Sequence, residues 1–116
     1  MILEILKYAA VILTIITGLV SLLWPKRVLG FTGLDVVGGR GITEVRTILG
    51  SVFVGLGAAA LYFNIPETYQ MLGITYLVMA VVRAISIVVD KSKVSSNIIS
   101  MISELILGII LVLIRS

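Results

Sequence analysis

The sequence predicts an all-α fold, a membrane-embedded four-helix bundle, from three observations. Of the 116 residues, 59% are hydrophobic and only 13% are charged, whereas a soluble domain is typically about 45–50% apolar and about 25% charged. The mean hydropathy is +1.22. The apolar residues form long runs, each close to the roughly 20 residues that a helix needs to cross a membrane. A chain this short cannot bury so much apolar surface in its own core. We therefore expect lipid to cover it.

The predicted spans follow one another through short connections. They cover residues 5–24, 45–63, 69–89 and 98–114, within a single transmembrane domain of residues 1–116. Inside lipid, backbone polar groups must be bonded within a helix or a closed barrel. Barrel strands alternate apolar and polar residues, and these runs do not, so we expect helices.

The first run is expected to remain in the protein as a span. A cleaved signal peptide has a basic start and a cleavage pattern of small residues. Here Glu4 stands close to Lys7, and the run ends in Trp24 and Pro25 without small residues. Pro25 and the two basic residues after it are expected to stop the helix.

The connections contain the residues that usually begin and end helices. Residues 28–43 include five glycines, which argues against a stable helix throughout and leaves open a short interfacial helix or a partly re-entrant loop. Thr43 is the expected N-cap of the second span, with Glu44 at the positive end of its dipole. Pro66 is expected in the first turn of the third span, and residues 95–97 are expected to cap the fourth.

The basic residues predict an orientation. They are concentrated in the connections 25–43 and 90–97, while Lys7 and Arg115 lie near the termini and residues 64–68 have none. Basic loops remain in the cytoplasm. We therefore expect a multi-pass protein of the plasma membrane, with both termini outside and the two basic connections inside.

Four ionisable residues within or beside the spans are the main candidates for a site. They are Glu44, Arg46, Arg83 and Glu104. Arg83 lies seven residues before Asp90, roughly 10 Å along its helix, and Glu104 lies roughly 9 Å from the start of the fourth span. Buried charges in a membrane are usually paired and face protein or water. The four charges sum to zero, so we expect one intramembrane polar cluster.

Helical periodicity adds three contributors to this cluster. Tyr76 and Asp90 share the Arg83 face of the third span, and Ser100 shares the Glu104 face of the fourth. One interpretation is a purely structural network, in which Arg83 also reaches the interface through its long side chain. The other is a network that lines a ligand or ion site. Glu104 is the residue expected to have a function, because an acid cannot reach as far toward water.

The order of these residues resembles a family of small four-helix membrane proteins, the domain of unknown function 4345 (DUF4345). That family has a Glu-x-Arg start and a glycine-rich middle in its second helix, an Arg and then an acid late in its third, and an inward Glu in its last. The resemblance implies a four-helix fold and a polar cluster, with no established activity. The matching residues are Glu44, Arg46, Gly50, Gly55, Gly57, Arg83, Asp90 and Glu104.

The absence of cysteine and histidine from the sequence excludes thiol nucleophiles, Cys/His zinc sites and haem with these ligands. We expect no catalytic residue, cofactor or metal, and no nucleic-acid partner. A lipid-modifying enzyme remains as an alternative, although no paired-carboxylate metal motif or Ser/Lys dyad supports it.

Two functions remain open. The first is a binding, accessory or structural membrane protein that holds membrane lipids, a small hydrophobic ligand, a partner's helix or a second copy of itself. The alternative is a small proton-coupled transporter of hydrophobic or cationic solutes. Small multidrug resistance transporters have a similar length, but they need a membrane-embedded Glu in the first span, where this chain has only Glu4 at the very start.

Overall fold

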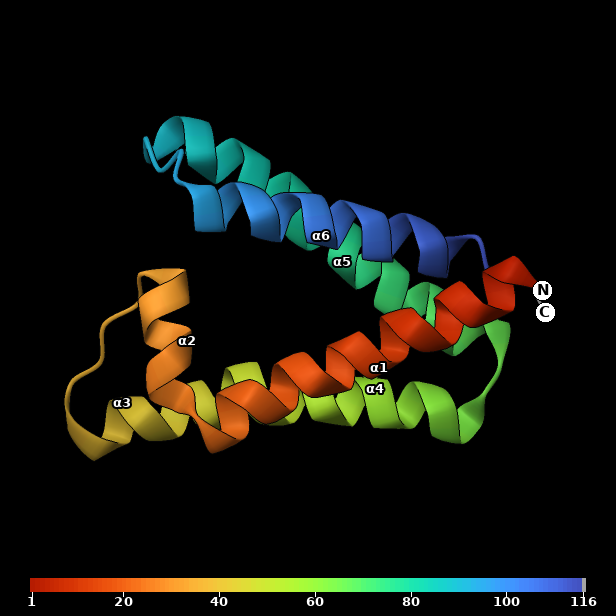
Figure 1. The fold of residues 1–116 in the computed structure, drawn as a ribbon, viewed down its shortest axis with the longest axis horizontal. Helices are drawn as coiled ribbons and strands as arrows, with labels where there is room; N and C mark the ends of the chain where they lie inside the picture. The colour runs from red at the N-terminus through yellow and green to blue at the C-terminus, as the bar shows by residue number, and fades with distance from the viewer. Residues whose placement is uncertain (116) are drawn as a thin grey trace. The chain divides into compact units, whose positions relative to one another are not determined.

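The computed structural model describes residues 1–115, which contain helices and no strand (Figure 1). Within this part of the chain, four helical runs are long and apolar enough to cross a membrane. The all-α class and the membrane-length helices are thereby confirmed, while their arrangement as one bundle stays a prediction. The elements are α1 (Ile2–Leu23), α2 (Pro25–Thr32), α3 (Gly38–Glu44), the π-helix η1 (Val45–Ser51), α4 (Val52–Phe63), α5 (Pro66–Val89) and α6 (Ser95–Val112).

The second span begins earlier than predicted. It runs without a break from Gly38 to Phe63 through α3, η1 and α4. The predicted N-cap at Thr43 is therefore wrong, because Thr43 lies inside α3 and its hydroxyl donates to the Gly39 carbonyl at 3.0 Å. Three glycines of this segment, Gly38, Gly39 and Gly41, lie within the helical run, although glycine has a low helix propensity.

The connection before this span contains the short helix that the sequence left open. Pro25 occupies the first turn of α2, where its missing N–H has no cost. Gly33 ends α2 with a left-handed φ of 77°, and its N–H donates to the Leu29 carbonyl at 3.0 Å. Residues 33–37 then lead to α3 without helical structure.

The third and fourth spans also begin slightly earlier than predicted. Pro66 lies in the first turn of α5, as expected. The predicted cap at residues 95–97 is wrong, because these residues are helical and Val94, in an extended conformation, precedes α6 without a side-chain cap bond. Polar residues can extend a helix at a membrane surface because water bonds the groups of its first turn.

The chain divides into two compact units, and one of them is Val11–Tyr62. In this unit the helices α1 and α4 pack closely (Figure 1). A Cβ added at Gly18 would lie only 2.7 Å from the Gly50 carbonyl oxygen and 2.7 Å from the Val54 nitrogen. The small residues of the second span thus allow close backbone contact, as expected for helices in a membrane.

The other unit joins Met1–Ala10 to the chain from Phe63 onward. Its helices α5 and α6 lie side by side (Figure 1). A Cβ added at Gly73 of α5 would lie 2.8 Å from the backbone nitrogen of Val112 in α6. This close contact holds the two helices in one register along their length. The prediction of a single domain remains a prediction.

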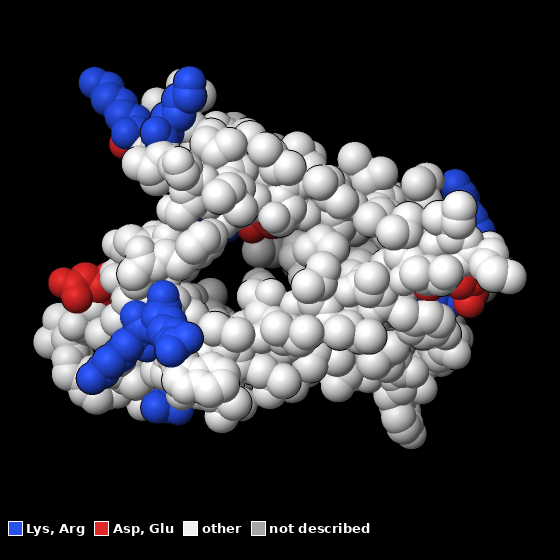
Figure 2. Space-filling view, in the orientation of Figure 1, with Lys and Arg blue, Asp and Glu red and all other residues white. Residues whose placement is uncertain are grey.

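The surface of the helices is strongly apolar. Side chains such as Val81 and Val88 are 57% and 77% exposed, which in water would be a costly apolar patch. Figure 2 shows that most of the face in view carries no charged side chain. These surfaces are suited to contact with acyl chains. The location in the plasma membrane and the orientation of the termini stay predictions.

Candidate functional site

The centre of the candidate site is an ion pair between α5 and α6. Arg83 donates from Nε to Oε1 and from Nη2 to Oε2 of Glu104, both at 2.8 Å. The Glu104 side chain is 7% exposed and that of Arg83 is 33% exposed. Such a bidentate pair fixes the orientation of the guanidinium as well as its charge. The structure therefore brings together two of the four residues predicted for the cluster.

A third contact extends this pair toward the turn between the helices. Arg83 Nη1 donates to Asn97 Oδ1 at 3.0 Å. The amide nitrogen of Asn97 in turn donates to the carbonyl and the hydroxyl oxygens of Ser92, each at 3.0 Å. We call Glu104, Arg83, Asn97 and Ser92 the Arg83 network. Among the described residues, no buried side-chain nitrogen or oxygen lacks a hydrogen-bond partner.

Asn97 and Ser92 were outside the predicted site. Asn97 precedes Glu104 by seven residues, which is about two helical turns. Residues with this spacing lie on the same face of a helix, so the sequence did indicate that Asn97 is close to Glu104. Ser92 had no comparable signal. It reaches the network only because the chain turns back between α5 and α6, and its hydroxyl lies 3.5 Å from the Ser86 carbonyl.

The three predicted contributors have different positions. Tyr76 is buried at 6% exposure on α5. Asp90 directly follows α5, and its N–H donates to the Ser86 carbonyl at 2.8 Å. Ser100 is half-buried on α6 and forms none of the hydrogen bonds that Arg83 makes within the described chain.

A groove opens beside the Arg83 network and continues along α5. Its polar part has a volume of about 470 Å³, and an adjoining part of about 250 Å³ is lined only by apolar side chains. Val78 and Val82 line both parts, so the two parts adjoin along α5. The polar part is lined by Val78, Met79, Val82, Arg83, Ser86, Asp90, Ser92 and Asn97, and the apolar part by Ile74, Leu77, Val78, Val81 and Val82.

Glu44 and Arg46 have their own partners in the other unit. Glu44 forms an ion pair with Arg40, four residues earlier, and both side chains are largely exposed. Arg46 Nη1 donates to the Leu22 carbonyl at 2.6 Å, near the end of α1. Because these two residues belong to a different unit from Arg83, a single cluster of all four stays a prediction.

Arg46 also lies in the π-helix η1, which the sequence pattern did not reveal. π-helices are rare and occur frequently at functional sites. A second groove of about 490 Å³ lies beside this segment. It is lined by Leu34, Asp35, Val36, Val37, Arg40, Gly41, Glu44, Val45, Ile48 and Leu49.

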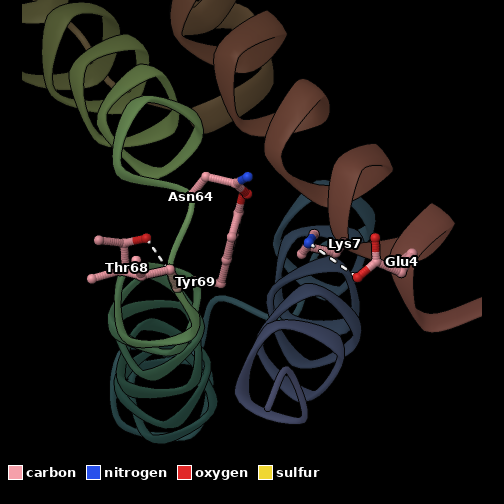
Figure 3. Close-up of polar contacts among 6 residues, drawn as sticks. Glu4, Lys7, Asn64, Thr68 and Tyr69 are labelled. Carbon is pink, nitrogen blue, oxygen red and sulfur yellow. Dashed lines mark hydrogen bonds and ion pairs between the residues drawn. The ribbon is translucent and has the colours of Figure 1, made fainter. Parts of the chain in front are cut away.

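A separate polar group surrounds Lys7 of α1 (Figure 3). The ammonium lies 3.4 Å from the Glu4 carboxylate and within 4.5 Å and 4.8 Å of the ring centres of Tyr8 and Tyr69. The Tyr69 hydroxyl donates to Asn64 Oδ1 at 2.6 Å. Lys7 is only 4% exposed, a burial that its position near the N-terminus did not predict. Aromatic faces and one carboxylate offset the cost of burying its charge.

The comparisons with known proteins agree with the fold. Neither the curated proteins nor the solved structures gave a match to this chain. A family model described as a domain of unknown function (DUF4345) matches residues 2–115. The resemblance first noted in the Glu-x-Arg start, the glycines and the late acids is therefore confirmed over nearly the whole chain. The chain belongs to the DUF4345 family of domains of unknown function.

Proposed function

We propose that this chain is a lipid-binding membrane protein, which holds an amphiphilic lipid along α5. The observation that supports the proposal is that the apolar and polar parts of the groove adjoin and share two lining residues. Its apolar part runs along Val78 and Val82 and leads directly to the polar part at Arg83. An amphiphile has the same sequence of chemistry along its length. Ligand sites of this kind are typically about 300–1,000 Å³ in volume.

The polar end of the groove is preorganised. Arg83 is held by Glu104 and Asn97 through three hydrogen bonds, so a ligand would not have to order this side chain on binding. A site that is fixed before the ligand arrives loses less conformational entropy on association. This favours a binding role for the Arg83 network over a purely structural one.

The apolar end is suited to an acyl chain. Val78 and Val82 are each 57% exposed, and Ile74 is 55% exposed, so this side of α5 is open in the described chain. A bilayer would present acyl chains to such a surface. The groove distinguishes one lipid from the surrounding lipids because its polar part contains the guanidinium of Arg83, which Glu104 and Asn97 hold in place.

The transporter alternative depends on Glu104, which is buried within α6 at 6% exposure. An ionisable residue within a span is a candidate for proton transfer. Proton-driven uptake into vesicles that is lost in Glu104→Gln, with the fold retained, would favour transport. Lipid binding does not require such uptake.

Native mass spectrometry of the detergent-purified protein tests the proposal. Val82→Trp places a large ring in both parts of the groove, and Ile85→Trp is its matched control. The two positions are similarly exposed, at 57% and 59%, but Ile85 lines neither part of the groove.

We expect one co-purifying lipid on the natural protein and on Ile85→Trp, and about tenfold lower occupancy on Val82→Trp, a change of about 1.4 kcal/mol in binding. Bare protein, or equal lipid occupancy in both variants, would contradict the proposal.

A further inference from the structure

Resting on this lipid-binding function, we infer that the preferred lipid has a zwitterionic headgroup, a phosphate ester that ends in a primary ammonium. The inference comes from the polar groups that face the groove. Arg83 and Asp90 line the same polar part, and they offer donors and an acceptor at separate places along α5.

Arg83 can still donate hydrogen bonds to a ligand. A guanidinium has five N–H donors, and Glu104 and Asn97 accept from three of them, which leaves two within the described part of the chain. The remaining donors are one on Nη1 and one on Nη2. Paired guanidinium donors match the oxygens of a phosphate, so the phosphate of a lipid headgroup fits this end of the groove.

Asp90 offers the opposite chemistry. Its carboxylate accepts hydrogen bonds and cannot donate when ionised. It follows the last residue of α5, where the helix dipole favours a positive charge. A primary ammonium has N–H donors for this carboxylate, whereas a trimethylammonium has none. Lys91 and Lys93 are exposed and do not line the groove.

The charges also disfavour an anionic headgroup. Arg83 has one positive charge, and Glu104 and Asp90 have one negative charge each, so the charges of these three side chains sum to −1. A headgroup with a phosphate and no amine could bind Arg83 but would leave the Asp90 carboxylate without a positive group of the ligand. A headgroup with both groups matches each side chain with the opposite charge.

The order of the groups along α5 agrees with such a lipid. The apolar part of the groove is lined by residues up to Val82, then comes Arg83, and Asp90 lies seven residues further, directly after α5. A phospholipid bound in this direction places its chain, phosphate and ammonium in the same order.

A competition experiment tests the headgroup. The natural protein is incubated with equimolar dioleoyl phosphatidylethanolamine, phosphatidylcholine and phosphatidylglycerol, and native mass spectrometry measures the occupancy of each. We expect phosphatidylethanolamine to exceed each of the others about tenfold. Asp90→Asn should abolish the preference over phosphatidylcholine while total lipid occupancy remains. Glu67→Gln, an exposed acid at the opposite end of α5, is the control and should keep the preference.

The outcomes separate the two proposals. Lipid bound without a headgroup preference, a preference for phosphatidylglycerol, or an unchanged preference in Asp90→Asn would overturn this inference and leave the lipid-binding function in place. Absence of bound lipid from the natural protein in every mixture would overturn both.

Discussion

The chain contains two ion pairs of the same Arg–Glu chemistry in very different surroundings. The side chains of Arg83 and Glu104 are 33% and 7% exposed, and those of Arg40 and Glu44 are 79% and 53% exposed. The first pair joins two helices, whereas the second joins residues four apart in one helical run. The difference shows that burial and an interhelical position, rather than the presence of the charges, distinguish a site from a local contact.

The largest effect is expected from Glu104→Gln. The amide keeps one oxygen acceptor for Arg83 but turns N–H donors toward the second guanidinium donor, so a partly buried charge loses its partner. We expect the free energy of unfolding to fall by about 2–4 kcal/mol, since breaking a buried pair from one side is costly. Thermal and denaturant unfolding in detergent measure this change. A loss of unfolding free energy below about 1 kcal/mol would mean that the pair contributes no more than an exposed ion pair, which would contradict the prediction.

A smaller effect is expected from Asn97→Ala. This change removes the acceptor of Arg83 Nη1 and the donor to Ser92, while Glu104 still holds the guanidinium. We expect a loss of about 1 kcal/mol, the usual size for a hydrogen bond of this kind. The same unfolding measurement applies, with Ser96→Ala in the same turn as control. Equal losses of stability in both variants would mean that the change acts on the start of α6 and not on the hydrogen bond to Arg83.

The smallest effect is expected from Glu44→Gln in the exposed pair. Solvent screens such a pair, and pairs four residues apart in a helix contribute only about 0.3–0.5 kcal/mol. We therefore expect a change below about 0.5 kcal/mol in the same unfolding assay. A loss as large as that of Glu104→Gln would show that Glu44 has a further partner, as the predicted four-residue cluster requires.

The Arg83–Glu104 pair was within reach of sequence reasoning. Each residue was placed roughly 9–10 Å from the same end of its span by counting helical rise, and the structure joins them. The burial of Lys7, in contrast, could not be predicted from the sequence. Its partner Tyr69 lies more than sixty residues away in the sequence, and only folding brings that ring 4.8 Å from the ammonium.

Composition and local pattern were sufficient for the helices and the approximate spans, whereas the family was first suggested by a resemblance in a few motifs. Inside lipid, a single apolar run of membrane length can bond its backbone N–H and C=O groups only within its own helix. Its secondary structure therefore follows from its own residues. The turn at Pro66 follows equally from one residue's missing N–H.

The partners of the polar side chains depended on tertiary packing. Glu44 and Glu104 are the same residue type beside apolar runs, yet one pairs within its own helical run and the other pairs across helices. The polar part of the groove likewise depends on how α5 and α6 meet, because Arg83 of α5 and Asn97 of α6 both line it. Hydropathy and helical period describe each span alone, whereas burial and hydrogen-bond partners are properties of two spans in contact.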